Sequence, residues 1–458
     1  MKILVCVKVI DGEINPFDEC AVEAALSVKD SEVTVISMCP ESAKSVLLPL
    51  TRLGVKRVIL ISDKVFAGSD TVATSYILSE TIKKLEYDMI FCGRQTIDGE
   101  TAQVGACLAT MLGISLITNV MEICDISSEQ VSCKTRMGEF TEKLPCLLTI
   151  EKINKLRFPS IRSKVGEVEV WDNSLINADV SKCGLSGSPT KVLKVFESVR
   201  GQRRCKFIDK TDLLPLIEKL SLEKKKETEI KSSDKKLKEV WAIGNEVLLQ
   251  AQAIAENVRV IDLSNPFEIA QMAKDEKPEV ILWNADLWGR KNAPIVSALL
   301  NTGLCADCTA LETDGEKLFM YRPAKGGTIS AKIKCDTNPQ MATVRTTDKN
   351  SKDIIVSGGR GIKDEFENLK AFAEKLGAEV CASRGLVDTG VAEYEMQVGL
   401  TGKMVCPKIY IAIGISGAVH HTVGIENADT VIAINPDKAA RIFEYADYGI
   451  VCELKDLY

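Results

Sequence analysis

Histidine is almost missing from this chain: the 458 residues include two, and these are adjacent, His420 and His421. A histidine-rich zinc site needs several imidazoles and is therefore excluded. A basic excess is also missing, because 58 Lys and Arg residues stand against 64 Asp and Glu residues, so a nucleic-acid-binding surface is not indicated. With 45% hydrophobic and 27% charged residues, the composition excludes wholesale disorder.

Long apolar runs are missing too, since no stretch approaches the ~20 residues of a membrane-spanning helix. The apolar residues 3–7 are too few for a signal peptide and predict a first strand. Sixteen cysteines are scattered along the chain, and one C-x-x-C motif runs from Cys305 to Cys308. This pair is either a redox dithiol or, as we favour, two small core thiols in a reducing compartment. We expect a cytoplasmic protein with no metal.

Strand-like and helix-like segments alternate along the chain, whose length predicts about three domains. Phe366, Leu369, Phe372 and Leu376 have helical spacing, and Gly377 is placed to end that helix. Strand–helix–strand repetition is typical of parallel sheets, so the sequence predicts an α/β protein. The strand-like runs are residues 3–7, 33–37, 57–61, 89–92, 280–283, 354–356, 409–413 and 431–434.

Two polar stretches mark expected boundaries. Residues 221–239 contain twelve charged residues and three large apolar ones, Leu222, Ile230 and Leu237, which predicts a solvated connector. A second polar stretch, residues 346–352, precedes a predicted strand.

A repeat crosses this connector. Gly99 and Gly289 are 190 residues apart, and so are Gly113 and Gly303, within similar strand–helix patterns. Chance can produce such spacing in an α/β chain, but the repeat favours two similar α/β units.

Small and polar residues follow each of the last four predicted strands, and 12 of the 30 glycines lie in residues 353–458. The carboxyl ends of parallel strands form a crevice where glycines let a ligand approach main-chain N–H groups. Arg360 and Arg384 could neutralise a diphosphate or a reduced ring, and Asn435 and Asp437 could bind hydroxyls or ring nitrogens. Residues 397–403 offer further main-chain donors. Four such loops predict a dinucleotide site, although any one of them could be an ordinary turn.

Both histidines fall in the predicted first turn of a helix, after Ser416 and Gly417. A lone histidine is more often structural than functional. A helix N-terminus disfavours an imidazolium unless an anion is near, and a reduced flavin ring would be such an anion.

These C-terminal loops resemble the FAD domain of the electron transfer flavoprotein α subunit, and segments before them are similar to the first domain of that subunit. The FAD-domain motifs are Ser357-Gly-Gly-Arg-Gly, Ala382-Ser-Arg, Asp388-Thr-Gly, Gln397-Val-Gly-Leu-Thr-Gly-Lys, Gly414-Ile-Ser-Gly-Ala-Val-His-His and Ala433-Ile-Asn. The earlier motifs are Thr302-Gly-Leu-Cys-Ala-Asp-Cys, Arg322-Pro-Ala-Lys-Gly-Gly and Pro339-Gln-Met-Ala-Thr-Val-Arg.

The N-terminal half resembles the β subunit of the same family. Its motifs are Val5-Cys-Val-Lys, Asn15-Pro-Phe-Asp-Glu, Ala24-Ala, Gly93-Arg-Gln-Thr-Ile-Asp-Gly-Glu-Thr-Ala-Gln-Val, Pro145-Cys, Arg157-Phe-Pro-Ser and Gly184-Leu-Ser-Gly-Ser-Pro-Thr. The chain thus resembles a β–α fusion. The implied fold is α/β, with two pseudo-symmetric parallel-sheet domains of nucleotide-binding type and a C-terminal flavodoxin-like or Rossmann-like parallel-sheet FAD domain. We expect a β-like domain at 1–182, a β-like tail and connector at 183–240, a shortened α-like first domain at 241–352 and the FAD domain at 353–458.

The resemblance also implies two sets of ligand contacts. The expected FAD contacts are Arg360, Ser383, Arg384, Val398, Gly399, Leu400, Thr401, Ser416, Gly417, Ala418, Val419, His420, His421, Asn435, Glu453 and Leu454. Four of these would act on the flavin: Arg384 over the ring, Thr401 at N5, His421 at the O2 edge and His420 as an added donor. The β-like half would bind AMP, or a second FAD, through Cys6, Asn15, Pro16, Phe17, Asp18, Val35, Gly93, Asp98, Gly99, Glu100, Thr101, Ala102, Gln103 and Val104.

The implied function is that of an electron carrier rather than a self-contained enzyme. It would move electrons from a flavoprotein dehydrogenase, of the acyl-CoA type used in fatty acid β-oxidation, to a quinone-, ferredoxin- or NAD-linked acceptor. One alternative is an NADH-dependent bifurcating flavoprotein with a second FAD. A remote alternative is a non-redox regulatory protein that binds a nucleotide.

The chain departs from the family pattern at several places. His420 stands where glutamine is usual, and Glu453 stands where aspartate is usual. The β-like half lacks a loop between Asp11 and Asn15, and residues 157–171 are short where the family has its partner-recognition loop. The α-like first domain is short as well, with about forty residues before Val280.

Overall fold

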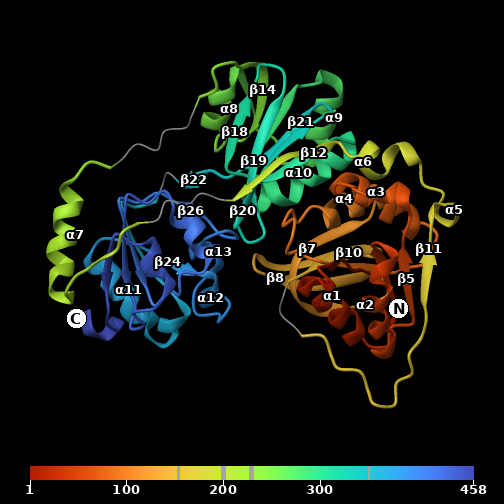
Figure 1. Cartoon of the computed structure of the whole chain (residues 1–458), viewed down its shortest axis with the longest axis horizontal. Coiled ribbons are helices and arrows are strands. Elements are labelled where there is room, and N and C mark those ends of the chain that lie inside the picture. The colour runs from red at the N-terminus through yellow and green to blue at the C-terminus, as the bar shows by residue number, and fades with distance from the viewer. Residues whose placement is uncertain (152–154, 198–202, 226–231, 349–350, 458) are drawn as a thin grey trace. The chain divides into compact units, whose positions relative to one another are not determined.

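The computed structural model describes residues 1–458 except 152–154, 198–202, 226–231, 349–350 and 458, and the chain forms two compact units (Figure 1). Unit 1 comprises Met1–Phe196, Ser232–Lys325 and Ser330–Val344, and unit 2 comprises Glu197–Lys231, Gly326–Ile329 and Arg345–Tyr458. Parts of both predicted boundaries, residues 226–231 and 349–350, lie outside the described residues. The finer division into four domains stays a prediction. No helix in the described part is both long enough and apolar enough to span a membrane.

The first half of unit 1 is built on a nine-stranded sheet in the order β11-β5-β4-β1-β6-β10-β7-β8-β9. Strands β11 to β7 pair in parallel, and β8 and β9 extend the sheet in antiparallel fashion. The strands are β1 Lys2–Cys6, β4 Glu32–Met38, β5 Arg57–Ile61, β6 Met89–Gly93, β7 Ser115–Ile126, β8 Gln130–Thr135, β9 Gly138–Lys143, β10 Cys146–Ile150 and β11 Val168–Trp171, with a small hairpin of β2 Val9–Ile10 and β3 Glu13–Ile14. The helices are α1 Pro16–Ser27, α2 Lys44–Leu47, α3 Thr71–Ile82, α4 Val104–Leu112, α5 Asn173–Ile176 and α6 Gly184–Gly187.

The second half of unit 1 repeats this arrangement with a five-stranded parallel sheet in the order β15-β14-β16-β21-β17. The strand order matches β4-β1-β6-β10-β7 of the first half, with the last two strands reversed in the same way. The predicted pair of similar α/β units is therefore confirmed. The strands are β14 Leu237–Ile243, β15 Ala255–Ile261, β16 Val280–Asn284, β17 Leu304–Cys308 and β21 Gln340–Val344, and the helices are α8 Leu248–Ile254, α9 Pro266–Glu276 and α10 Leu287–Leu300.

The two halves of unit 1 contact each other through equivalent segments. The Sγ of Cys107 in α4 donates to the carbonyl of Pro294 in α10 at 3.4 Å, and Nε2 of Gln103 donates to the carbonyl of Leu304 at 3.2 Å. The halves also share a four-stranded sheet in the order β12-β20-β19-β18. Its strands are β12 Thr190–Glu197, β18 Ala310–Thr313, β19 Leu318–Ala324 and β20 Ile329–Cys335.

Unit 2 is built on a seven-stranded parallel sheet in the order β13-β29-β28-β27-β23-β24-β25. Its first strand, β13, comes from the segment before the charged connector. The strands are β13 Lys206–Phe207, β23 Ile354–Gly358, β24 Glu379–Ser383, β25 Gln397–Val398, β27 Ile409–Ile413, β28 Thr430–Ile434 and β29 Tyr448–Ile450, with β22 Thr347–Asp348 paired to β26 Met404–Val405. The helices are α7 Leu213–Leu222, α11 Phe366–Lys375, α12 Arg384–Val387 and α13 Val419–Thr422.

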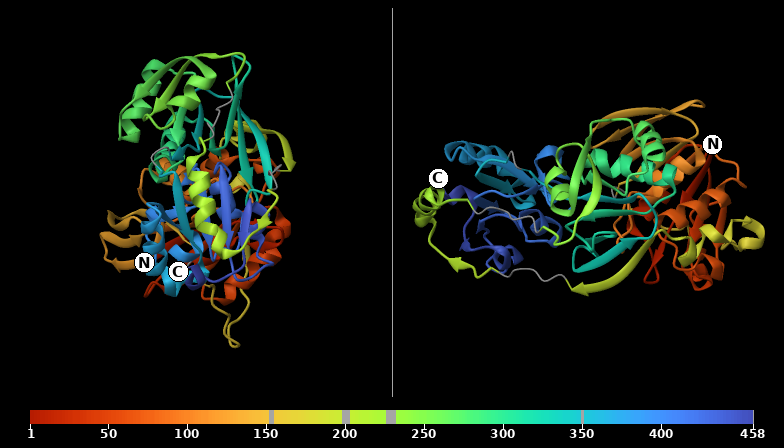
Figure 2. Two further views of the ribbon diagram at one scale, coloured as in Figure 1. Left: turned by 90° about the vertical axis from the view of Figure 1, so that its left-hand side faces the viewer. Right: turned by 90° about the horizontal axis from the view of Figure 1, so that it is seen from above.

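Helix α7 lies against the sheet of unit 2, as the yellow-green helix beside the blue strands shows in both figures (Figures 1 and 2). Leu213, Ile217 and Leu220 form its apolar face and belong to the core of unit 2. The predicted connector was too wide at both ends. Leu222 is the last residue of this helix, and Leu237 is the first residue of β14 and is fully buried. The connector was predicted from its density of charged residues, and that density also includes the last turn of an amphipathic helix and the first residues of a strand.

The predicted helix at residues 366–376 is confirmed as α11, and its end shows why glycine follows it. Gly377 has φ +62°, a left-handed conformation that glycine adopts without the steric cost of a Cβ. In this conformation the N–H of Ala378 turns back to the carbonyl of Ala373 at 2.9 Å, which closes the last turn.

We predict that Leu220→Ala destabilises unit 2 and that Leu222→Ala does not. Leu220 is 7% exposed on the apolar face of α7, whereas Leu222 on the same helix is 89% exposed. Removing a buried leucine side chain costs about 2–5 kcal/mol, while a surface change stays within about 0.5 kcal/mol. Urea unfolding followed by tyrosine fluorescence and circular dichroism measures both variants. Equal midpoints would show that α7 does not stabilise the core.

Candidate functional site

The carboxyl edge of the sheet in unit 2 brings the glycine-rich loops together. The chain leaves β23 toward β24 on one side and returns to β27 on the other, so the strand order changes direction between β23 and β27. Such a switch point is where ligands bind in open parallel sheets. Here the N–H of Gly359 donates to the carbonyl of Ile413 at 2.8 Å, and a Cβ on Gly359 would lie 1.9 Å from the carbonyl oxygen of Gly414. Only glycine permits this approach.

A second glycine shapes the loop after β27. Gly417 has φ +84°, and a Cβ there would lie 2.2 Å from the main-chain nitrogen of Ile442. Its conformation directs the chain into α13, with Ser416, Ala418 and His420 exposed. The helix begins at Val419, so the prediction that both histidines lie in a first helical turn is confirmed.

The two histidines have different surroundings. His421 is buried, with Nδ1 3.1 Å from the carbonyl of Val398 and Nε2 3.0 Å from the hydroxyl of Tyr410. A carbonyl only accepts, so Nδ1 carries the proton and Nε2 accepts from Tyr410. Burial lowers the pKa of His421 to about 4, while the bond to Val398 opposes that shift. The imidazole of His421 is therefore neutral at pH 7, and no anion is needed to offset a charged imidazolium at this helix N-terminus. Its proposed contact with a flavin edge stays a prediction.

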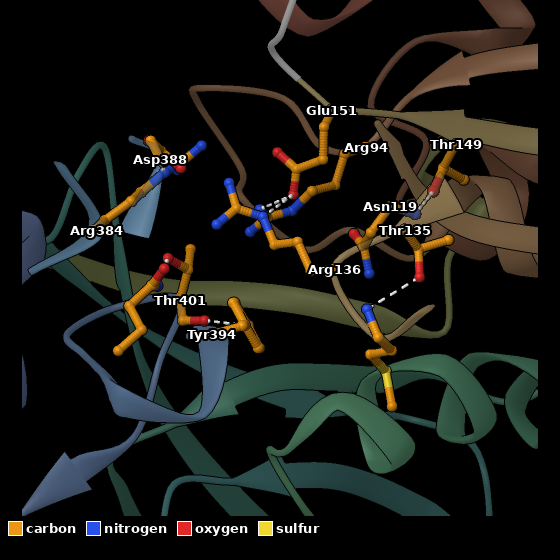
Figure 3. A network of polar contacts seen from close by, with 12 residues as sticks. Arg94, Asn119, Thr135, Arg136, Thr149, Glu151, Arg384, Asp388, Tyr394 and Thr401 are labelled. Atoms are coloured by element: carbon orange, nitrogen blue, oxygen red, sulfur yellow. Dashed lines mark hydrogen bonds and ion pairs between the residues drawn. The ribbon is translucent and has the colours of Figure 1, made fainter. Parts of the chain in front are cut away.

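Thr401 is held from two sides. Nε2 of Gln397 donates to Oγ1 of Thr401 at 2.7 Å, and the hydroxyl of Tyr394 donates to its carbonyl at 2.6 Å; Figure 3 shows the second contact. The amide of Gln397 occupies an acceptor position of the threonine oxygen. The hydroxyl hydrogen of Thr401 is not used in this bond and points away from Gln397. Sequence reasoning found Thr401 but missed Gln397 and Tyr394 as its supports.

Four of the main-chain N–H groups in residues 397–403, where we expected further donors for a ligand, already have partners in the chain. The N–H groups of Gly399, Gly402 and Lys403 donate to carbonyls within the loop, and the N–H of Leu400 donates to the carbonyl of His420 at 2.6 Å. A tight loop satisfies its own amides first, because a main-chain donor without a partner is costly.

Other predicted contact residues of unit 2 lie at the same edge with varied exposure. Arg360 is exposed at the end of β23, while Arg384 begins α12 directly after Ser383 and lies 3.4 Å from the carboxylate of Asp388, as Figure 3 shows. Asn435 follows β28 and is buried, with Nδ2 donating to the carbonyl of Ile415 and Oδ1 accepting from the N–H of Asp437. Its amide therefore shapes its own turn.

The last two predicted residues differ from the rest. Glu453 is exposed and paired with Lys455, and Leu454 is buried in the core of unit 2, so only its main chain can reach a ligand.

Unit 1 has a second switch point, between β1 and β6, and Asp18 occupies it. Its Oδ2 accepts from the N–H of Lys8 at 2.8 Å and its Oδ1 from the N–H of Gly93 at 3.1 Å, so one carboxylate joins the ends of two neighbouring strands. Burial raises the pKa of Asp18 to about 7, although bonds from Lys8, Asn15 and Gly93 oppose that shift. A side chain at Gly93 would collide with this carboxylate, since its Cβ would lie 2.2 Å from Oδ1 of Asp18.

Polar groups surround this second switch point. The Nζ of Lys8 pairs with Oδ2 of Asp98 at 2.6 Å, and Nδ2 of Asn15 donates to the carbonyl of Gln95 at 2.9 Å. The Oδ1 of Asn15 is buried and has no hydrogen-bond partner among the described residues. A buried acceptor of this kind is normally satisfied, so it fits a ligand that brings a donor, such as a nucleotide amino or hydroxyl group. Cys6 ends β1, in register with Cys92 of β6.

The predicted nucleotide loop, residues 98–104, is strained and only partly accessible. Glu100 and Ala102 have φ +53° and +54°, values that non-glycine residues rarely adopt and that occur often at functional sites. Gly99, Thr101 and Val104 are partly exposed, whereas Gln103 is buried with its Oε1 accepting from Thr71 and its Nε2 bound to Leu304. The side chain of Gln103 thus holds the two halves of unit 1 together. Phe17 and Val35 are buried core residues, while Pro16 is partly exposed.

One buried ion group near this site was missed by the sequence analysis (Figure 3). Glu151, directly after β10, lies between two guanidinium groups: Nη1 of Arg94 is 2.6 Å and Nε of Arg136 is 3.7 Å from its Oε1. Two guanidinium groups therefore approach one buried carboxylate beside the ends of β6 and β10. The sequence offered one signal for this ion group: Arg94 directly follows the apolar strand β6, and Glu151 directly follows the apolar strand β10.

Comparisons with known proteins agree with the two halves. A family model described as "Electron transfer flavoprotein domain" matches residues 3–175 and 268–355, and one described as "Electron transfer flavoprotein FAD-binding domain" matches residues 349–426. Electron transfer flavoprotein subunit alpha of Thermoanaerobacterium thermosaccharolyticum is 44% identical over 232 residues, which cover 41% of this chain and 70% of the relative. Electron transfer flavoprotein subunit beta of Megasphaera elsdenii is 39% identical over 236 residues, 43% of this chain and 87% of the relative. Protein FixA of Azotobacter vinelandii is 41% identical over 221 residues, 44% of this chain and 79% of the relative.

We predict that His421 makes folding stability fall in mild acid. The unfolded chain has the ordinary histidine pKa near 6.5 and the folded state a pKa of about 4, so the unfolded state binds the extra proton as the pH falls between these values. The contribution of His421 is complete above pH 6.5 and lost toward pH 4, by about 2 kcal/mol at pH 5. His421→Gln, which keeps one donor and one acceptor, should flatten the profile of unfolding free energy between pH 7.5 and 5. A profile as steep in His421→Gln as in wild type would contradict this prediction.

Asp18 should act in the opposite pH direction. Its folded pKa of about 7 lies above the ordinary carboxyl value of 3.8, so the folded state binds more protons between these values and stability falls as the pH rises through them. We predict that the unfolding free energy of wild type minus that of Asp18→Asn decreases by roughly 2–4 kcal/mol from pH 4.5 to pH 8. Urea unfolding at both pH values measures this difference, with Asp11→Asn as an exposed control. A difference that does not change with pH would contradict the prediction.

Proposed function

Since the chain belongs to the electron transfer flavoprotein family, with an alpha-type and a beta-type subunit joined in one chain, we propose that it is an electron carrier between a flavoprotein dehydrogenase and a second redox partner. The observation that carries the proposal is the FAD-binding family match at residues 349–426, which covers the loops after β23, β24, β25 and β27. The bound FAD would accept and release the electrons. The chain itself would bind, orient and shield that group.

The residues at the carboxyl edge of unit 2 fit an FAD. Gly359 and Gly417 allow main chains to approach where a Cβ would collide, and the exposed cation Arg360 suits a diphosphate. In this proposal Arg384 lies over the ring. The hydroxyl of Thr401, oriented by Gln397, donates to a ring nitrogen, and the neutral His421 fixes the loop at Val398. His420, in the first exposed turn of α13, is the added polar group.

The nucleotide in unit 1 is AMP or a second FAD in this proposal. The partnerless Oδ1 of Asn15 supports a ligand that brings a donor, such as a nucleotide amino or hydroxyl group, and the strained turn at Glu100 and Ala102 supports a functional role for this switch point. The guanidinium groups of Arg94 and Arg136 lie at the same edge of the sheet. AMP would be structural, whereas a second FAD would make the protein an NADH-dependent bifurcating flavoprotein. Among the described residues of unit 1, no contact favours the second FAD specifically.

We propose a surface for the donor in residues 157–171. Phe158 is 95% exposed and Ile161 is 98% exposed, with Val165 also exposed, and large apolar side chains are rarely presented to water without a partner. We assign this segment to docking of the dehydrogenase, of the acyl-CoA type by family resemblance. The acceptor would be linked to quinone, ferredoxin or NAD. The absence of disulfides among the described cysteines is compatible with the reducing cytoplasm, where the proposal places the protein.

The flavin and nucleotide content of the purified full-length chain tests the proposal. After saturation with FAD and gel filtration, we expect a yellow protein that dithionite bleaches, and acid denaturation that releases one FAD and one AMP. Two FAD and no AMP would favour the bifurcating alternative, and AMP without any flavin would favour the non-redox regulatory protein. A colourless protein without FAD contradicts the electron-carrier proposal.

A matched pair of glycine variants tests where the FAD binds. Gly359→Ala places a Cβ 1.9 Å from the carbonyl of Gly414, so the two loops must separate and FAD content should fall well below one per chain. Gly385→Ala, at the same edge, meets nothing closer than 3.6 Å and should keep its FAD. Equal FAD content in both variants would place the flavin elsewhere.

A further inference from the structure

Cys305 and Cys308 lie on the same face of β17, which a regular strand does not allow. Residues three apart on a strand point to opposite faces. Here Cys305 pairs with Ala342 and Cys308 with Val344, so three steps on β17 match two on β21. The extra residue is a bulge at Asp307, which has φ +57° and donates its N–H to Oγ1 of Thr343 at 2.8 Å. The bulge returns Cys308 to the face of Cys305.

This geometry brings the two thiols within reach of a disulfide. Two residues of extended chain on β21 span about 6.6 Å, so the Cα atoms of the paired cysteines are separated by a similar distance, within the ~4.4–6.8 Å that a disulfide tolerates. The Sγ of Cys308 already turns back toward Cys305, donating to its carbonyl at 3.6 Å. Both side chains are buried in one apolar cluster that includes their partners Ala342 and Val344.

A buried guanidinium faces this pair. Arg322 lies on β19, on the face that also buries Leu318 and Met320, and it is 6% exposed. Its Nε has no hydrogen-bond partner among the described residues. The nearby carboxylate of Asp307 pairs with Arg290, at 2.9 Å, and its charge opposes that of Arg322 by raising the pKa of Cys305. A negative charge at Cys305 would be stabilised by this guanidinium, because charges interact strongly inside a buried cluster.

The two thiols accordingly differ in acidity. The pKa of Cys305 is lowered by a hydrogen bond from Cys308 and by the charge of Arg322, both acting against burial. The pKa of Cys308 is raised well above its usual value by burial and then by its hydrogen bond with Cys305. One attacking thiolate beside one protonated thiol is the arrangement found in C-x-x-C redox pairs.

We propose that Cys305 and Cys308 are a thiol modification site: a dithiol, faced by Arg322, that a small peroxide converts reversibly into an intrachain disulfide. The Cys305 thiolate attacks one oxygen of hydrogen peroxide, breaks the O–O bond and becomes a sulfenic acid, and the leaving hydroxide takes a proton to form water. The Cys308 thiol then attacks that sulfur, and the sulfenic oxygen leaves as a second water. Two thiols are oxidised by two electrons, and one peroxide is reduced to two waters. A dithiol reductant reverses the change.

This site lies beside the contact between the two halves of unit 1. The carbonyl of Leu304, the residue before Cys305, accepts the hydrogen bond from Gln103, which lies in the proposed nucleotide loop. The inference does not depend on the proposed electron transfer, because its readout is the mass of a peptide and requires neither flavin nor a redox partner.

Peptide mass after peroxide treatment tests the proposal on the full-length protein. The protein is treated with hydrogen peroxide, alkylated after unfolding and cleaved with trypsin, which releases residues 292–317 with both cysteines. We expect this peptide unalkylated and two hydrogen masses lighter, and restored by dithiothreitol. Exposed Cys124 reports that the peroxide dose was sufficient. An alkylated 292–317 peptide at a dose that oxidises Cys124 would overturn the proposal.

Two comparisons separate this pair from ordinary buried thiols. Cys6 and Cys92 are also buried and in register on neighbouring strands, and a hydrogen bond with Cys6, followed by burial, raises the pKa of Cys92. The 292–317 disulfide should form at least about tenfold faster than a Cys6–Cys92 link, since one pKa unit changes the thiolate fraction about tenfold. Arg322→Met should slow it by a similar factor, and Arg322→Lys should retain most of the rate. Equal rates for the two pairs, or in wild type and Arg322→Met, would overturn the role of the guanidinium.

If Arg322→Met does not fold, the single cysteine variants decide instead. Cys308→Ser should leave Cys305 as a sulfenic acid that dimedone traps, and Cys305→Ser should leave Cys308 unmodified. The reverse labelling pattern, or none, contradicts the assignment of Cys305 as the attacking thiol.

Discussion

The close approach of two main chains at the edge of a parallel sheet is the constraint on which unit 2 depends. Strands β23 and β27 are neighbours in the sheet. The chain continues from β23 to β24 on one side and from β27 to β28 on the other, so the loops that follow the two strands start side by side and then diverge. The N–H of Gly359 closes the gap by donating to Ile413, and the carbonyl of Gly414 lies where any Cβ on residue 359 would be. Main-chain contacts, rather than side chains, hold these two loops together. The main chain of Arg360 and Ser416, the exposed residues that follow, is therefore held in a fixed position.

In unit 1, a side chain rather than the main chain holds the ends of the two strands together at the switch point. The ends of β1 and β6 are joined by the carboxylate of Asp18, which accepts one N–H from each strand. Burying a carboxylate is expensive, and the raised pKa of Asp18, about 7, expresses that cost, whereas two main-chain donors offset part of it. The glycine solution of unit 2 has no such dependence on protonation. The two candidate sites of one chain therefore respond differently to pH, although they occupy equivalent positions in their sheets.

Much of the fold could be predicted because parallel strands buried on both faces are short apolar runs, and all eight predicted runs begin and end within two residues of the observed strands. The repeat of two α/β halves could also be read from glycine spacing. Contacts between distant segments could not. The burial of His421 against Tyr410, the clamp of Gln397 on Thr401 and the carboxylate of Glu151 between Arg94 and Arg136 depend on which strands become neighbours. The end of α7 was likewise assigned to the charged connector, because the burial of its apolar face depends on packing against a distant sheet.

The placement of β13 and α7 has a consequence for how this chain can be divided. Unit 2 takes its edge strand and a covering helix from residues 197–231, while the residues on both sides of that segment belong to unit 1. The C-terminal unit is therefore not a continuous stretch of sequence. A truncated chain beginning at Arg345 would leave β29 as an unpaired edge and uncover the apolar surface under Leu213, Ile217 and Leu220, which favours aggregation over folding. A gene split at the charged connector would instead yield two fragments that each contain one complete parallel sheet of unit 1. The seven-stranded sheet of unit 2 and the shared four-stranded sheet would be complete only after the fragments associate, because β13 and β12 belong to the first fragment.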